Sequence, residues 1–129
     1  MLVRKLAVVV TTPPYDNLTT TTIGIIKAAI ANQITVVGVF FYQTGVLNAA
    51  KYFSMPSDEF QISDEWQQLA EQHNVPLHLC STAAEKHGLM SEHIHDKDNE
   101  LSLINQYFTI SGLGELVELT NDADKVVKL

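Results

Sequence analysis

The sequence contains a single cysteine among its 129 residues and no Cys-x-x-Cys pair. One cysteine cannot form an internal disulfide, and the lack of a pair excludes the common cysteine-based zinc sites and a dithiol redox couple. Any thiol chemistry must therefore combine this one sulfur atom with a group that another molecule supplies.

Basic residues are also few. Lys and Arg number 8 against 15 Asp and Glu, which gives a net charge of −7, and the basic residues form no run. A protein that binds DNA or RNA needs a basic surface to displace counterions from the phosphates. We therefore expect no direct binding of nucleic acid.

Long apolar runs are absent as well. No stretch reaches the roughly 18 to 20 apolar residues of a membrane span, so we expect no membrane segment. The run Leu6–Val10 follows two basic residues but is too short for the apolar region of a signal peptide, and a cytoplasmic location is expected. The length suits one domain over residues 1–129, and 46% apolar residues are enough for a core.

The first third of the chain predicts a strand, a helix and a second strand. Leu6–Val10 is continuously apolar, which is typical of a strand buried on both faces of a parallel sheet. Residues 20–31 have helical periodicity and are apolar on nearly all sides, so this helix is expected to be buried on more than one side, by the sheet and, as one alternative, by another subunit. Thr35–Phe41 is β-branched and aromatic, as strands are. This order predicts a right-handed βαβ unit.

The remaining chain continues the alternation. Residues 42–58 are expected to form a loop with a helical turn near 48–52, and a helix with Ser63 as N-cap should end at Asn74. The further expected elements are a strand at Pro76–Leu79, a helix at 81–87 closed by Gly88, a polar loop at 93–100, a helical turn at 101–106, a strand at Tyr107–Ile110, a helix at Leu113–Leu119 and a strand at Lys125–Leu129.

Cys80 lies where a predicted strand ends and a predicted helix begins. Sites in open parallel sheets form outside the carboxyl ends of the strands. A helix N-terminus favours an anion and can lower the ordinary thiol pKa of about 8.5, which favours the nucleophilic thiolate. A reactive thiol is one interpretation; the other is a buried cysteine that packs as a small apolar side chain.

Three further features lie near the same predicted sheet edge. His78 is two residues before Cys80 on the same strand face and could act as a base, although strand histidines more often simply pack. Tyr15 could line a pocket or could pack in a proline turn. The segment 111–114 could present N–H groups to an anion, although a tight turn is the simpler interpretation, and no G-x-G-x-x-G motif is present.

A metal-like grouping occurs at His93, His95, Asp96 and Asp98. Metal sites need fixed ligands supported by neighbouring groups, and this segment has the composition of a polar loop. We therefore expect no metal and no organic cofactor.

An ordered set of segments resembles the DsrE-like sulfur-transfer family, and within it the TusD-type subunits. These segments are Val9–Tyr15, Val39–Ala49, Ser57–Phe60, Trp66–Leu69, Gln72–Leu77, Cys80–Ala84, Gly88 and Phe108–Gly114. They cover essentially the whole chain.

The resemblance implies a three-layer α/β/α domain with a five-stranded parallel sheet. It also implies that Cys80 accepts sulfur as a persulfide from a TusA-like donor and passes it to a TusE-like acceptor, toward 2-thiouridine in the wobble position of tRNA. TusB-like and TusC-like subunits would complete a heterohexamer. The sequence leaves open whether the chain forms a homo-oligomer when it is expressed alone.

Residues expected to bind substrate or line the pocket around Cys80 are Tyr15, Ser81, Lys86, Ser111 and Gly112. Two departures concern partner choice. Relatives tend to carry arginines where Lys86 and His87 precede Gly88, and often a glycine in place of Thr12.

Two other functions remain open. The same persulfide chemistry could serve sulfur oxidation, and a non-catalytic assembly module could hold a purely structural cysteine.

Overall fold

Five parallel strands form one sheet in the order β4-β3-β2-β1-β5. The computed structural model describes residues 2–90 and 103–129. The strands are β1 (Lys5–Val10), β2 (Thr35–Phe41), β3 (Leu77–Cys80), β4 (Thr109–Ser111) and β5 (Lys125–Lys128). The parallel sheet confirms the predicted fold class, and the strand-helix alternation along the chain produces it.

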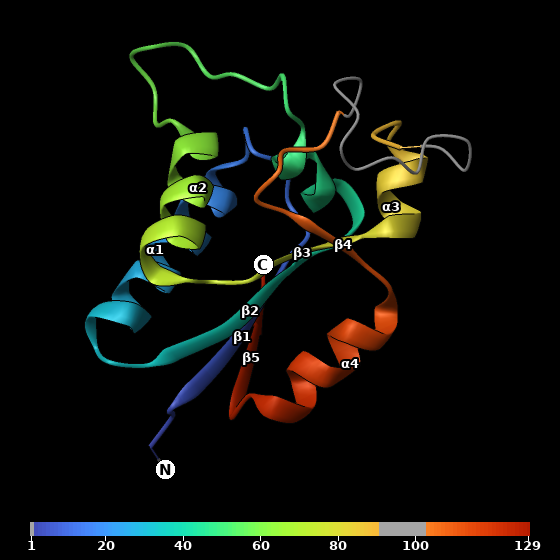
Figure 1. Cartoon of the computed structure of the whole chain (residues 1–129). Helices are drawn as coiled ribbons and strands as arrows, with labels where there is room; N and C mark the ends of the chain where they lie inside the picture. The colour runs from blue at the N-terminus through green and yellow to red at the C-terminus, as the bar shows by residue number, and fades with distance from the viewer. Residues whose placement is uncertain (1, 91–102) are drawn as a thin grey trace.

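Helices cover both faces of this sheet (Figure 1). They are α1 (Asn17–Ala31), α2 (Ile62–His73), α3 (Ser81–Lys86) and α4 (Leu113–Asp122), and a 3-10 helix η1 spans Gln43–Ala49. The pair α1 and α2 lies on one face and α4 on the other, which gives three layers (Figure 1). Within the described part of the chain, no helix is long and apolar enough to span a membrane.

Helix α1 begins three residues earlier than the sequence predicts, because Asp16 caps it. The Asp16 carboxylate accepts a hydrogen bond of 2.8 Å from the backbone N–H of Leu18. One side of α1 is buried, but Gly24 and Ala28 on the other side are exposed. Within the single chain α1 is thus buried on one side, and burial of its other side by another subunit stays a prediction.

Helix α2 begins at Ile62, and Ser63 is not its N-cap. Ile62 is buried in the core, and this burial starts the helix without a side-chain cap. The predicted C-terminal end is confirmed, because Asn74 adopts the left-handed conformation with φ of 53°. An ion pair between Lys27 and Glu65 joins α1 to α2.

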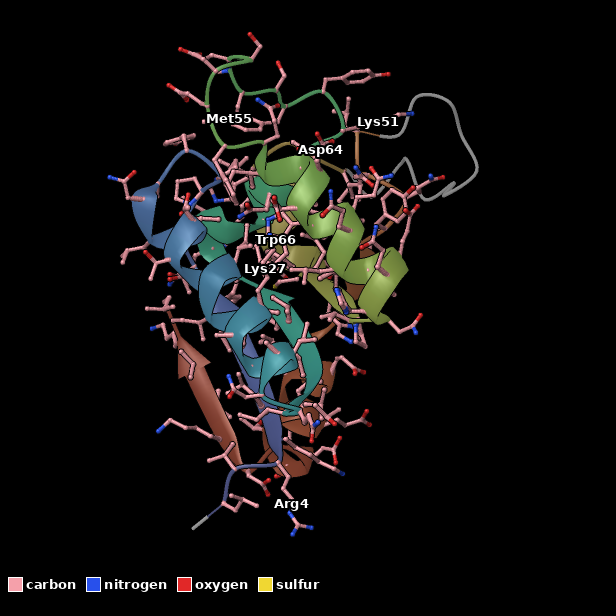
Figure 2. The ribbon with its side chains drawn as sticks, turned by 90° about the vertical axis from the view of Figure 1, so that its left-hand side faces the viewer. Arg4, Lys27, Lys51, Met55, Asp64 and Trp66 are labelled. Carbon is pink, nitrogen blue, oxygen red and sulfur yellow. The ribbon has the colours of Figure 1, made fainter. Side chains whose placement is uncertain are left out.

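The core beneath α1 and α2 is aromatic. Phe41 on β2 contacts Trp66 and Phe108 edge-on, at ring-centroid distances of 4.9 and 5.0 Å. The Trp66 indole donates a hydrogen bond of 3.0 Å to the side-chain oxygen of buried Asn48. Figure 2 views this face and shows Trp66 within the packed layer between the two helices and the sheet.

Several boundaries differ from the predicted ones. The helical turn expected at 48–52 is η1, which begins at Gln43. Strand β4 begins two residues late because Phe108 turns into the core. The loop predicted at 93–100 lies outside the described residues, as do the first two residues of the turn at 101–106; in the described part of that turn, Ile104 forms an isolated antiparallel bridge with Ala50 rather than a helix.

Candidate functional site

Cys80 is the last residue of β3 and the N-cap of α3. Its backbone is extended, with φ of −63° and ψ of 119°, and the helix that follows has six residues and is closed by Gly88 at a φ of 76°. The thiol is free and only 2% exposed. The sequence therefore predicted the position of Cys80 correctly, and the structure adds that the sulfur is shielded from solvent.

A polar cluster lies on the sheet face that Cys80 shares. Cys80 and Ser111 are partners in the β3–β4 register, and alternation along β3 places His78 and Cys80 on one face. The His78 Nδ1 lies 3.1 Å from the Ser111 Oγ. On the other side of the ring, Nε2 lies 3.5 Å from the Glu115 carboxylate, which α4 supplies. We call His78, Ser111 and Glu115 the histidine cluster.

The environment of His78 acts on its charge in two opposing ways. Partial burial is the larger influence and lowers the pKa of His78, whereas the neighbouring Glu115 carboxylate raises it. The net direction is downward, so the neutral imidazole predominates at neutral pH. His78 can then accept a proton from a neighbouring group.

The other predicted site residues are placed unequally. Ser81 follows Cys80 directly, and Gly112 is the N-cap of α4 beside Ser111. Lys86 is at the far end of α3, about 9 Å along the helix axis. Tyr15 follows β1 and is 66% exposed, with its ring 6.5 Å from that of Phe53. The structure thus gathers Ser81, Ser111 and Gly112 near Cys80, but not Lys86 or Tyr15.

Sequence reasoning missed Glu115. Its position four residues after Ser111, in the first turn of the predicted helix, could have placed Glu115 near the same sheet edge. Its contact with His78 could not be predicted, because that contact depends on which strands are neighbours in the sheet. His78 itself was named as a candidate base from its spacing to Cys80.

A cavity and the arrangement of metal-ligating side chains bear on other kinds of site. A surface cavity of about 390 Å³ lies between α1 and α2, lined by Lys27, Ile30, Ala31, Gln68, Leu69 and His73, and contains none of the predicted site residues. In residues 2–90 and 103–129, no three His, Cys, Asp or Glu side chains are grouped as metal ligands. The grouping at His93 to Asp98 lies outside these residues.

The fold and the site define an open parallel α/β protein with a shielded thiol at the carboxyl edge of its sheet. A family model described as the DsrE/DsrF-like family matches residues 4–129. Because that match spans nearly the whole chain, the chain belongs to the DsrE/DsrF-like family.

One curated relative agrees with this membership, and one solved structure shares the fold. The chain is 35% identical over 103 residues to a protein of Pasteurella multocida (strain Pm70) named "Sulfurtransferase TusD homolog", covering 80% of this chain and 81% of that protein. The crystal structure of the ychN protein from E. coli superimposes with a TM-score of 0.78 at 23% identity, over 98% of this chain and 99% of that one. The second match supports the fold alone.

Proposed function

We propose that this chain is a sulfurtransferase subunit that accepts sulfur as a persulfide on Cys80 and passes it on. The observation that carries the proposal is that the only thiol of the sequence lies at the carboxyl end of β3. Membership of the DsrE/DsrF-like family and similarity to a protein named as a sulfurtransferase support it. Thiol-based transfer in a chain with one cysteine must use Cys80.

The reaction consists of two thiol exchanges. The Cys80 thiolate attacks the outer sulfur of a donor persulfide; a new S–S bond forms, the donor's S–S bond breaks, and the electron pair leaves with the donor thiolate. An acceptor thiolate then attacks the outer sulfur on Cys80, and the pair returns to the Cys80 Sγ. No net oxidation occurs, because one S–S bond replaces another in each step.

Burial of Cys80 imposes a condition on this reaction. With 2% of the residue exposed, a protein-borne persulfide cannot reach the sulfur until neighbouring side chains move. Helix η1 packs against both β3 and α3 and is therefore one of the elements around the thiol. Shielding also protects a bound persulfide from solvent thiols between the two exchanges.

The physiological setting that we propose is a sulfur relay toward 2-thiouridine in tRNA. A TusA-like protein would donate, a TusE-like protein would accept, and TusB-like and TusC-like subunits would complete the assembly. Large apolar side chains that the chain leaves exposed, Leu113 and Val117 on α4 and Leu18 on α1, are suited to subunit contacts. The location would be the cytoplasm.

Intact-mass analysis after incubation with glutathione persulfide tests the chemistry. We expect the full chain to gain the mass of one sulfur atom, a dithiol reductant to remove it, and Cys80→Ser to gain none. Ser54→Ala, at an exposed serine before α2, is the matched control because it keeps the thiol. A gain that persists in Cys80→Ser, or no gain in the native chain, contradicts the proposal.

Tests in cells address the setting. In a strain without the native gene, wild-type protein should restore 2-thiouridine in tRNA and Cys80→Ser should not. Restoration by both proteins excludes a role for the thiol in the tRNA pathway. If neither protein restores 2-thiouridine although the wild type takes up persulfide sulfur in vitro, the sulfur transfer belongs to another route, such as sulfur oxidation.

One observation favours a second function. Cys80 belongs to the buried core, as a purely structural cysteine would. The chain would then be a non-catalytic assembly module, and its thiol would resist both iodoacetamide and glutathione persulfide until the protein is denatured.

A further inference from the structure

We propose that an apolar surface patch with an acidic rim binds the protein that exchanges sulfur with Cys80, and that this partner presents a basic and apolar surface. The patch consists of the exposed residues Tyr15, Tyr52 and Leu103 and the half-buried Phe53. This inference rests on the proposed function, because it concerns the partner of the same thiol. It adds the surface by which this chain would recognise that partner.

Three segments that are far apart in the sequence form the patch. The Tyr15 ring, after β1, lies 6.5 Å from the ring of Phe53, which belongs to the loop between η1 and α2. In that loop, the backbone N–H of Lys51 donates a hydrogen bond of 2.7 Å to the Leu103 carbonyl oxygen. Tyr52 is 73% exposed and Leu103 43% exposed. Large apolar side chains that are exposed and grouped in this way are typical of protein–protein contact sites.

The patch lies at the sheet edge where β3 ends in Cys80. Because all the strands are parallel, the segment after β1 that carries Tyr15 is at the same edge as the end of β3. Only β2 separates β1 from β3, which is a distance of about 10 Å at the usual strand spacing. Figure 1 shows the loop between η1 and α2 at the same end of the molecule as α3. An interface of ordinary size, about 800 Å² per partner, can therefore cover both the patch and the end of β3.

The loop that carries Tyr52 and Phe53 is held by its own hydrogen bonds. The backbone N–H of Glu59 donates to the Pro56 carbonyl oxygen at 2.9 Å. The side-chain amide of Gln61 donates to the carbonyl oxygens of Pro56 and Glu59 at 2.8 and 3.0 Å. A loop that is already ordered loses less conformational entropy when a partner binds, so these bonds favour association at the patch.

The charges around the patch indicate the kind of partner. The loop and the start of α2 carry three exposed carboxylates, Asp58, Glu59 and Asp64, and one basic residue, Lys51. Figure 2 shows Lys51 and Asp64 at the same end of the molecule. Among the described residues, none of the three carboxylates takes part in an ion pair. A basic partner would neutralise this rim, whereas a second copy of this chain, with its net charge of −7, would bring carboxylates together, which is unfavourable.

Two assays on the full chain separate docking from chemistry. Loading by glutathione persulfide needs no protein partner, whereas transfer from the loaded chain to a TusE-like acceptor needs docking. Tyr52→Ala should load within about twofold of wild type, but its second-order rate constant for transfer should fall at least about tenfold, as expected for an aromatic residue at the centre of an interface. Tyr15→Ala should show a smaller loss of transfer. Val117→Ala, at an exposed apolar residue of α4, is the control and should transfer at the wild-type rate.

The acidic rim is tested by combining Asp58→Asn with Glu59→Gln. Salt screens the attraction between exposed charges, so this double variant should transfer sulfur about threefold more slowly than wild type at about 20 mM salt and equally fast at about 0.5 M salt. Glu118→Gln combined with Asp122→Asn removes the same number of charges from the exposed side of α4. This second double variant is the control and should match wild type at both salt concentrations.

The outcomes separate this inference from the proposed function. If wild type takes up no sulfur from glutathione persulfide, or takes it up and passes none to the acceptor, the sulfurtransferase proposal fails and this inference with it. If wild type loads and transfers, but Tyr52→Ala or the double variant of Asp58 and Glu59 transfers at the wild-type rate at low salt, this inference alone is overturned. It is also overturned if sedimentation shows a wild-type dimer that Tyr52→Ala converts to a monomer, because the patch would then join two copies of this chain.

Discussion

The two faces of the sheet differ in how they are packed. Beneath α1 and α2, Phe41 and Trp66 form an aromatic core, and the buried Asn48 side chain is hydrogen-bonded to Trp66. On the α4 face, Leu119 is the one helix residue that is fully buried, and the histidine cluster lies where the helix begins. The first face supplies stability, and the second keeps the ionisable side chains of His78 and Glu115 only partly buried.

The largest expected effect is on the aromatic face. Trp66→Ala should lower the free energy of unfolding by about 3–5 kcal/mol, because it leaves a cavity against Phe41 and removes the partner of Asn48. Denaturant titration gives the value. Val117→Ala, on the exposed side of α4, is the control and should change stability by less than about 0.5 kcal/mol. Similar decreases in the free energy of unfolding of the two variants would contradict the claim that the aromatic face supplies most of the stability.

The next effect concerns the buried amide of the aromatic face. The Asn48 side chain donates to the Gly45 and Thr12 carbonyl oxygens at 2.9 and 3.0 Å and accepts from Trp66. Asn48→Ala should cost about 2–3 kcal/mol, since the buried indole N–H loses its acceptor. Thermal or chemical unfolding measures this loss, with exposed Asn121→Ala as the matched control. If Asn48→Ala were as stable as Asn121→Ala, the Asn48 amide would contribute nothing to the stability of this face.

A smaller effect is expected where α4 approaches the sheet. A Cβ on Gly38 would lie 2.6 Å from a Leu119 methyl group, which is the end of a flexible side chain and can turn aside. Gly38→Ala should therefore cost about 1–2 kcal/mol. A double-mutant cycle provides the check: in a Leu119→Ala background most of this loss should disappear. An unchanged loss would locate the strain in the backbone instead.

The smallest effect is at the junction of α4 with β5. The Asp124 carboxylate accepts from the backbone N–H groups of Arg4 and Lys5, both at 2.9 Å, and these bonds lower its pKa below 3.8. A carboxyl with a lowered folded-state pKa stabilises the fold above its unfolded value and loses that contribution as pH falls through the folded value.

Asp124→Asn should therefore be slightly less stable than wild type at pH 7, and the difference should vanish well below pH 3.8. Unfolding curves at several pH values measure it. A difference that is constant with pH would show that the charge of Asp124 is irrelevant.

The sequence predicted most of the fold because its signals are local. Apolar runs marked β1 and β2, and Asn74 with its left-handed preference marked the end of α2. The predicted boundaries are wrong where burial of a side chain in the core, and not a capping residue or a turn motif, determines where a helix or strand begins. Ile62 starts α2 by entering the core, and Phe108 delays β4 by turning toward Phe41. Neither contact can be read from neighbouring residues.

The site was predictable in part for the same reason. The position of Cys80 follows from a strand ending where a helix begins, which is a local pattern. The histidine cluster could not be predicted from the sequence, because His78 and Ser111 are 33 residues apart and meet only when β3 and β4 pair. Lys86 is only six residues after Cys80, but the length of α3 separates the two side chains. Tyr15 follows a strand that ends at the same sheet edge as Cys80, but in the strand order β1 is not adjacent to β3.

Transfer of an isotopically labelled sulfur is the most direct measurement of the central claim. Wild-type protein loaded with the label should be mixed with a TusE-like acceptor, and both intact masses followed over time. Sulfur transfer through Cys80 predicts that the label leaves this chain and arrives on the acceptor cysteine at the same rate. Label that stays on Cys80, or that reaches the acceptor equally fast from the donor when this chain carries Cys80→Ser, would contradict it.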